Sequence, residues 1–388
     1  MEEEKCTIQI SRDLQEPMPL LLHPELHRGF IYTKEPDNTI SVEAGDSIRV
    51  ACPGGRIYFS RVKSYESATL ECIRDKTFLL THDGGTEMFH QIYCDKYPQH
   101  SVRRISRGCK VGVTGEIGFS IRTDERKEFI RIIDFCHDEQ LGQTIYAHAL
   151  IPSVIDSAEI SVPRPSFTKS GFFEGISMDN IYSRSHQQET LALIVGSHKL
   201  ANRYIHDRGN YFLSRGHLAA KLDFIFEAQQ RATFYSVNTV PMWQNINDGN
   251  WKKIEKSVRN YASRRNRNLE VWTGSLGVLE LEDFEGKMKK IYLDYHDEER
   301  VAIPVPKLLF KVVYDRYRLA GVVFITVNNP HLNRLTGDYV VCEDICTEIN
   351  FSGWDMRTER GYSYCCSVDD FRNAFPYLPE FKTRRLLI

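Results

Sequence analysis

The sequence predicts an α+β fold in two parts: a small β-rich N-terminal region over residues 1–140 and a mixed domain over residues 141–388. Three observations favour this division. The chain has 388 residues, which is long for one hydrophobic core and suits two domains. Short β-rich runs separated by turn signals fill the first part. Helix and strand patterns are mixed from about residue 190 onward.

The N-terminal region consists of short runs rich in β-forming residues, such as TISVEAGDSIRVACPGG, ATLECI and CKVGVTGEIGFSI. Asp83-Gly84-Gly85 lies between two apolar runs and predicts a hairpin turn. The proline-containing run SVPRPSF near Val162 predicts a loop, so we expect the boundary between about residues 138 and 166.

The second part is expected to have two strands and then a helix at its centre. Helical periodicity predicts helices over residues 189–205 and 250–265. Strands are expected at residues 211–216, 231–238, 269–281 and 308–327.

The ten cysteines lie in the first 140 and the last 50 residues. Their even number is compatible with disulfides, and Cys342-x3-Cys346 with Cys365-Cys366 leaves a zinc site as the alternative. The cysteines favour a secreted protein. The acidic start MEEEKCTIQ has no apolar core of a signal peptide and favours an intracellular one, so the compartment stays open. No run approaches the roughly 18 apolar residues of a membrane span.

The helix that begins near Asn247 carries chemistry on one side. Placed at 100° per residue, its apolar stripe comprises Trp251, Ile254, Val258, Tyr261 and Ala262. A basic side opposite the stripe is formed by Lys252, Lys253, Lys256 and Arg259. Glu255 lies instead at the edge of the apolar stripe, and Asn247 projects toward the same side.

An amide and a carboxylate that point inward are costly unless something satisfies them. A capping Asn247 and a Glu255 that extends to solvent would explain each alone. Together with His217 on a neighbouring strand, they indicate a hard-cation site, because Mg²⁺ accepts amide and carboxylate oxygens and keeps most of its waters. The net charge of −2 does not by itself indicate a protein that binds nucleic acid.

The run SRGHLAAK, then RATFYSVNTVP, then NINDGNWKKIE resembles the signature of the DNA/RNA non-specific endonucleases. These are the ββα-metal or His-Me finger nucleases, which include endonuclease G. The similarity is strongest to the secreted insect nucleases that degrade double-stranded RNA, and it covers Tyr211 to Ser263. The resemblance implies a ββα-metal domain with a mixed or antiparallel sheet, preceded by the β-rich region. It also implies an Mg²⁺-dependent enzyme, with Mn²⁺ as a substitute, that hydrolyses RNA and DNA and double-stranded RNA in particular.

Position by position, the resemblance assigns the general base to His217 and the protein ligand of Mg²⁺ to Asn247. Glu255 would hold a water ligand of the metal, Arg215 would contact the phosphate, and Asn238 would help to position the site. A homologue that binds nucleic acid without cleaving it is the alternative. The oligomeric state is left open, a homodimer included.

Three neighbouring residues add expectations of their own. Ser214 replaces the Asp that often precedes RGH in the family, and Met242 stands where a Gln is common, which would alter substrate contacts. Gly216 is expected to turn the backbone so that Arg215 and His217 both face the cleft. The basic residues Lys252, Lys253, Lys256 and Arg259 are candidates for phosphate binding, with a solvated helix face as the alternative.

Overall fold

The computed structural model describes residues 5–33, 39–59, 64–123, 126–351 and 353–388. Within these ranges, no helix has the length and apolar character needed to cross a membrane. Strands dominate both parts of the chain, and helices occur mainly after residue 178. The α+β class predicted from the sequence is therefore confirmed.

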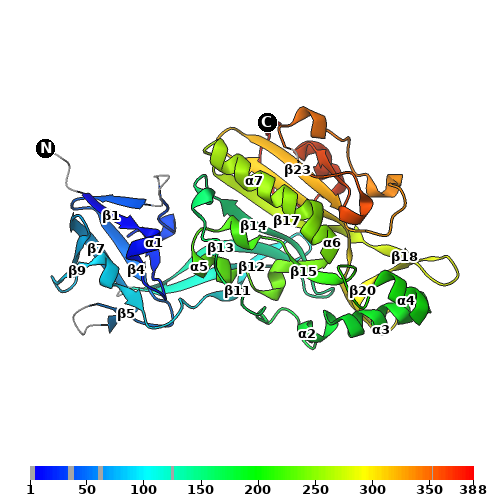
Figure 1. The fold of residues 1–388 in the computed structure, drawn as a ribbon, viewed down its shortest axis with the longest axis horizontal. Helices are drawn as coiled ribbons and strands as arrows, with labels where there is room; N and C mark the ends of the chain where they lie inside the picture. The colour runs from blue at the N-terminus through cyan, green and yellow to red at the C-terminus, as the bar shows by residue number, and fades with distance from the viewer. Residues whose placement is uncertain (1–4, 34–38, 60–63, 124–125, 352) are drawn as a thin grey trace.

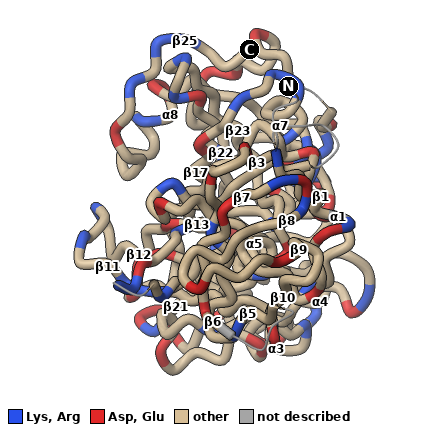
Figure 2. Tube along the Cα trace, turned by 90° about the vertical axis from the view of Figure 1, so that its left-hand side faces the viewer, with Lys and Arg blue, Asp and Glu red and all other residues tan. Residues whose placement is uncertain are grey.

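The N-terminal region is built on a five-stranded antiparallel sheet in the order β2-β4-β7-β8-β9. Its strands are β2 (Leu20–Leu22), β4 (Ser47–Ala51), β7 (Ser67–Arg74), β8 (Thr77–Leu80) and β9 (Thr86–Met88). The expected hairpin at Asp83-Gly84-Gly85 joins β8 to β9. Smaller sheets are formed by β1 (Lys5–Gln9) with β3 (Thr39–Glu43), and by β10 (Tyr93–Cys94), β5 (Ile57–Tyr58) and β6 (Ser64–Tyr65). Figure 2 shows basic and acidic residues interspersed over this region.

The second part is centred on a nine-stranded sheet in the order β11-β12-β13-β14-β17-β22-β23-β24, with β25 paired to β23. All pairs are antiparallel except β23 with β25. The strands are β11 (Ser101–Cys109), β12 (Gly112–Arg122), β13 (Lys127–Asp138), β14 (Gln143–Ile151), β17 (Leu269–Val278), β22 (Pro306–Asp315), β23 (Ala320–Val327), β24 (Ser363–Cys366) and β25 (Arg385–Leu386).

Strands β11 to β13 precede residue 140 but belong to this large sheet. They run between the N-terminal sheets and β14 (Figure 1). We therefore propose that the two parts divide near residue 100 rather than at residue 140.

Helices cover both faces of the large sheet because alternate residues of its central strands point to opposite sides. Leu309 and Val313 of β22 pack in the cluster that contains Trp251 and Val258 of α7 (Lys252–Arg264) and the turn before it. Phe310 packs instead against Phe371 and Phe375, in and just after α8 (Val368–Ala374). Figure 1 shows α7 lying across the sheet.

The centre of the second part has two strands and then a helix, as predicted, but its second strand is β16 (Thr239–Trp243) and not the predicted residues 231–238. β15 (Leu213–His217) pairs antiparallel with β16, and the chain continues through α6 (Gln244–Ile246) and a π-helical segment (Asn247–Trp251) into α7. This is the expected ββα arrangement. Helices α2 (Met178–Ile181), α3 (Arg184–Val195) and α4 (His198–Tyr204) lie apart from α7 (Figure 1). The hairpins β18 (Glu280–Glu282) with β19 (Met288–Lys290) and β20 (Tyr292–Tyr295) with β21 (Val301–Pro304) complete the domain.

Two predicted elements differ from the structure. The helix expected over residues 189–205 is two helices, because Gly196 takes a left-handed conformation (φ 70°) and the Ser197 hydroxyl caps α4. The strand expected at residues 231–238 is the end of α5 (Glu227–Ala232) followed by a 3₁₀ turn. Its apolar residues are buried in the core, so tertiary packing overrides their β propensity.

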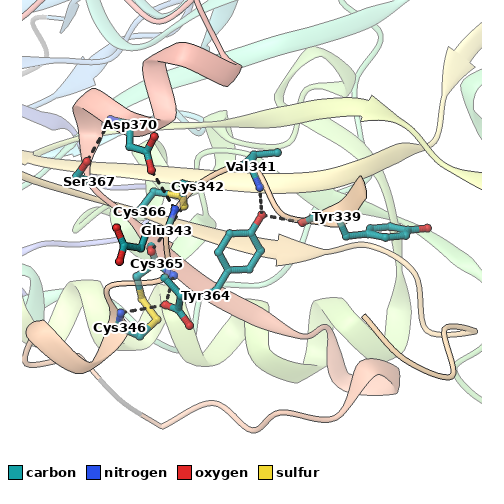
Figure 3. The surroundings of a disulfide bond; sticks show 11 residues. Tyr339, Val341, Cys342, Glu343, Cys346, Tyr364, Cys365, Cys366, Ser367 and Asp370 are labelled. Carbon is teal, nitrogen blue, oxygen red and sulfur yellow. Dashed lines mark hydrogen bonds between the residues drawn. A yellow bond between two sulfur atoms is a disulfide. The ribbon is translucent and has the colours of Figure 1, made fainter. Parts of the chain in front are cut away.

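The ten cysteines form five disulfides: Cys6–Cys72, Cys52–Cys94, Cys109–Cys136, Cys342–Cys366 and Cys346–Cys365. The last two join residues 342–346, which precede β24 in the chain, to β24 itself (Figure 3). All four cysteines of the alternative zinc site are used in these bonds, so the zinc interpretation is wrong and the disulfide interpretation is confirmed.

Candidate active site

One cavity of about 710 Å³ is lined by Arg215, His217, Asn247 and Glu255. The residues come from β15, the π-helical segment and α7, so the ββα unit brings together positions up to 40 residues apart. Lys252 and Arg259 of the basic helix face also line this cavity. Asn238, Lys253 and Lys256 are not among its lining residues.

Arg215 and His217 face the cavity together because they are two residues apart on one strand. Gly216 between them is therefore not a turn, and the expected role is wrong. Its lack of a side chain instead makes room for Met242, since a Cβ here would lie 2.6 Å from Met242 Cε. Met242 is fully buried beneath the strand, which places it away from the cavity.

The His217 ring lies between Phe167 and Phe234, with centroids 5.2 and 4.8 Å away. Its Nε2 is buried and has no hydrogen-bond partner among the described residues. Burial, with the charges of Arg164 and Lys221, lowers the pKa of His217 to about 3. The imidazole is therefore neutral at physiological pH and has an unshared electron pair available to accept a proton.

Asn238 is buried behind the strand that carries His217. Its amide nitrogen donates to the carbonyls of Ala219 (2.9 Å) and Thr233 (3.0 Å), and its oxygen accepts from the Ala219 N–H (2.9 Å). These bonds fix the turn that follows His217. Asn238 can thus act on the site only through the backbone.

Asn247 begins the π-helical segment, an irregularity that is often found at functional sites. Its side-chain nitrogen donates to Ser214 Oγ (3.3 Å), and Ser214 Oγ in turn donates to the Met242 carbonyl (3.0 Å). Ser214 thus orients the amide. The Asn247 oxygen accepts no hydrogen bond from any residue that the structure describes, and it is available to a ligand.

The C-terminal segment holds this π-helical segment in place. Gly249 lies so close to it that a Cβ would be 2.5 Å from the Arg360 carbonyl oxygen. Asn250 donates to the carbonyls of Asp355 (2.6 Å) and Gly361 (2.7 Å) and accepts from the Asp355 N–H (3.0 Å). The conformation that presents Asn247 therefore depends on residues more than 100 positions later.

Glu255 lies above a buried ammonium group. Lys311 of β22 is 1% exposed, and its Nζ donates to Thr273 Oγ1 (2.7 Å). Burial raises the pKa of Glu255, while the charges of Lys311 and Arg259 act against that rise. Arg259 also forms a buried ion pair with Asp223 (2.8 Å), so Glu255 belongs to a network of opposite charges beneath the cavity.

Arg215 is held on several sides. Its Nη2 donates to the Met178 carbonyl and to Asp179 Oδ1, each at 2.6 Å. Its guanidinium lies 5.2 Å from the Phe167 ring and 5.0 Å from the Tyr182 ring. The Asp179 side chain is 82% exposed, so an incoming anion can compete with it for Arg215.

Comparison with known families agrees with this geometry. The family model described as DNA/RNA non-specific endonuclease matches residues 111–371, more than half of the chain. The chain belongs to this family. It is a nuclease, and the DNA/RNA non-specific endonucleases are metal-dependent enzymes.

Curated relatives extend the similarity beyond the family model. A salivary endonuclease from Lutzomyia longipalpis is 27% identical over 337 residues, covering 86% of this chain and 73% of the relative. The salivary protein Tsal1 from Glossina morsitans morsitans is 25% identical over 338 residues, covering 85% and 80%. Among solved structures, an EndoG/EndoGI complex matches with 14% identity and a TM-score of 0.39, covering 69% of this chain and 89% of that one.

The cavity of this DNA/RNA non-specific endonuclease fits a hard divalent cation. The Asn247 oxygen and the Glu255 carboxylate line it without a hydrogen-bond donor among the described residues. Among the residues that the structure describes, the cavity holds no cluster of three His, Cys, Asp or Glu side chains. Both the amide and the carboxylate are oxygen ligands of the kind that hard divalent cations prefer.

The basic helix face is only partly free. Lys253 pairs with Asp355 (3.3 Å), and Arg259 turns toward Asp223, so the expectation that Arg259 belongs to an outer basic face is wrong. Arg259 adjoins Glu255 on the helical wheel, which places it at the cavity. Lys252 and Lys256 are exposed.

Sequence reasoning did not identify three cations near the site. Arg164 and Lys221 line the cavity, and Lys221 Nζ donates to the Val162 carbonyl, which anchors the loop that carries Arg164. Arg164 lies in the run SVPRPSF, whose prolines predict a loop but no site. Lys311 interrupts the apolar run LLFKVV, and a lysine in a central strand is a signal that could have been followed.

Proposed function

We propose that this nuclease is an Mg²⁺-dependent, sequence-non-specific endonuclease that hydrolyses phosphodiester bonds of RNA and DNA, with double-stranded RNA as the preferred substrate. The observation that carries the proposal is the single cavity shared by His217, Asn247 and Glu255. A neutral base, a free amide oxygen and a carboxylate meet there beside several cations.

His217 is proposed to accept the proton of the attacking water. The water oxygen forms a bond to phosphorus while the bond from phosphorus to the leaving oxygen breaks, and the imidazole of His217 takes the proton. The lowered pKa of His217 keeps it unprotonated for this step at neutral pH.

The cations of the cavity are proposed to bind the phosphate. Arg215 and Arg164 would oppose the negative charge that grows on the non-bridging oxygens, with Asp179 displaced from Arg215. Asn238 would keep His217 in position through the turn that it fixes.

Asn247 would hold Mg²⁺, and Glu255 would face the waters around the ion. When bound, the ion would act as a Lewis acid at the phosphate and stabilise the leaving oxygen. Mn²⁺, which accepts the same ligands, would substitute for it.

Two further points rest on the relatives and on covalent structure. The resemblance to insect nucleases that degrade double-stranded RNA supports that substrate. Five disulfides require an oxidising compartment, and relatives named salivary support secretion, so we propose that the protein works outside the cell.

The test is a cleavage assay with double-stranded RNA and plasmid DNA at the same salt concentration. We expect both to be cut, RNA faster, with loss of activity in EDTA and recovery on addition of Mg²⁺. Cleavage that persists in EDTA would contradict the metal requirement. Binding without cleavage would identify an inactive homologue.

A further inference from the structure

A second cavity, of about 510 Å³, lies at the far end of α7. It is lined by Ser257, Asn260, Tyr261, Arg264, Arg265, Asn350 and Phe351. Two of these side chains are cationic and none is acidic. Arg264 and Arg265 are both exposed, and neither has an ion pair with any residue that the structure describes. Unpaired arginines beside amide and hydroxyl groups form a site for an anion such as phosphate.

A row of side chains, three exposed and one half-buried, connects this cavity to the catalytic one. Lys252, Lys256, Asn260 and Arg264 follow one another at intervals of four residues, which places neighbours about 6 Å apart on the helix surface. Lys252 lines the catalytic cavity, and Asn260 and Arg264 line the second one.

The other cations of the helix region are already paired. Lys253 contacts Asp355, Arg259 contacts Asp223, and Arg267 lies 3.8 Å from Asp315. Lys252 has only a 3.9 Å approach to Asp248, with its side chain 70% exposed. The free charges thus lie along the row and at its end, rather than over the whole basic tract.

We propose that Arg264 and Arg265 form a distal phosphate-binding subsite, and that the substrate backbone runs along α7 from the catalytic cavity to it. This rests on the proposed nuclease function. Arg264 lies twelve residues after Lys252, or about 18 Å along the axis at ~1.5 Å per residue. At ~3.4 Å per nucleotide step, the subsite binds a phosphate roughly five steps from the cleaved bond.

The experiment measures binding of a double-stranded RNA of about 20 base pairs as a function of salt, in a His217→Ala background so that the substrate stays intact. The Arg264→Gln/Arg265→Gln variant is compared with a control of equal charge change, Arg28→Gln/Arg74→Gln, in the N-terminal region. Arg28 and Arg74 are exposed and lie outside both cavities.

We expect the distal variant to lower the slope of log affinity against log salt by roughly two, and to weaken binding about 10- to 100-fold at 0.1 M salt. The control should change neither. An equal change in both variants would show a general charge effect and overturn the subsite, as would an unchanged slope in the distal variant.

Substrate length supplies the second arm. In the catalytically intact background, the distal variant should cut a trinucleotide at the wild-type rate and cut the long duplex with a raised KM. Slower cleavage of the trinucleotide by the variant would contradict the distal subsite. So would an unchanged duplex KM in the variant when neither protein cuts the trinucleotide. Loss of heparin binding without loss of RNA binding would assign the arginines to sulfated polysaccharide instead. Failure of wild-type protein to cut any nucleic acid would refute the nuclease proposal itself, which the binding arm does not require.

Discussion

The flanks of the chain and its middle are held together in different ways. All five disulfides lie before residue 137 or after residue 341. The stretch between them contains no cysteine and supplies every residue of the catalytic cavity. That stretch relies on packing and on buried polar groups such as Lys311 and Asn238. Covalent links therefore stabilise the flanks, while non-covalent contacts position the residues of the catalytic cavity.

The largest loss of activity should result from a substitution in the middle of the chain, with little loss of stability. His217→Ala removes the proposed base, and we expect kcat to fall about 10²–10⁴-fold. The melting temperature should fall only slightly, because Nε2 forms no hydrogen bond with the described residues and only the ring contacts with Phe167 and Phe234 are lost. His198→Ala, at an exposed position, is the matched control. A fully active His217→Ala enzyme would end the assignment of the base.

Removal of a disulfide in the N-terminal flank should lower stability without changing kcat. Removal of one in the C-terminal flank should lower both stability and kcat. Cys346→Ser/Cys365→Ser opens a loop of about 19 residues and should cost about 3 kcal/mol of unfolding free energy. It should also reduce kcat, because residues 355–361 between these cysteines hold the Asn247 segment.

Cys6→Ser/Cys72→Ser is the control for that comparison. The disulfide that this variant removes closes a longer loop, so we expect a loss of unfolding free energy of similar size or larger, measured by urea unfolding. Its kcat should stay at the wild-type level, since these cysteines lie in the N-terminal sheets. Equal loss of kcat in both variants would show that the two flanks do not differ.

A smaller effect is expected from Asn247→Ala. Loss of the amide oxygen should raise the Mg²⁺ concentration needed for half-maximal activity by at least about tenfold, comparable to other lost metal interactions. The quantity to measure is activity across a magnesium titration. Ser214→Ala, which removes only the hydroxyl that orients the amide, should shift the same curve less.

The smallest effect should be that of pH on the protonation of His217 in the folded protein. The pKa of His217 is lowered to about 3, so its NMR signals should not move between pH 7.5 and 5. In the chain unfolded by urea, the same ring should titrate near 6.5. Between these pKa values only the unfolded chain binds the proton, so His217 makes the folded state less stable as the pH falls through 6.5. A folded-state titration near pH 6.5 would contradict the buried, neutral ring.

The sequence allowed more of the site to be predicted than of its surroundings. Helix periodicity placed Asn247 and Glu255 on one side of a helix, and the resemblance to the DNA/RNA non-specific endonucleases added His217 to them. Arg164, Lys221 and Lys311 could not be placed with them, since their approach depends on how a loop and a distant strand pack against the ββα unit. The strand predicted at residues 231–238 failed for the same reason: β-forming residues there fill the core in helical and turn conformations.

The contact between Asn250 and the C-terminal segment has a consequence for biosynthesis. Asp355 leaves the ribosome 105 residues after Asn250, so a growing chain lacks the groups that hold the Asn247 segment until translation is nearly finished. The cysteines that flank this C-terminal segment, at positions 342, 346, 365 and 366, form disulfides in an oxidising compartment. With the secretion proposed above, the messages and ribosomes of the producing cell would be separated, in both time and place, from a completed catalytic cleft.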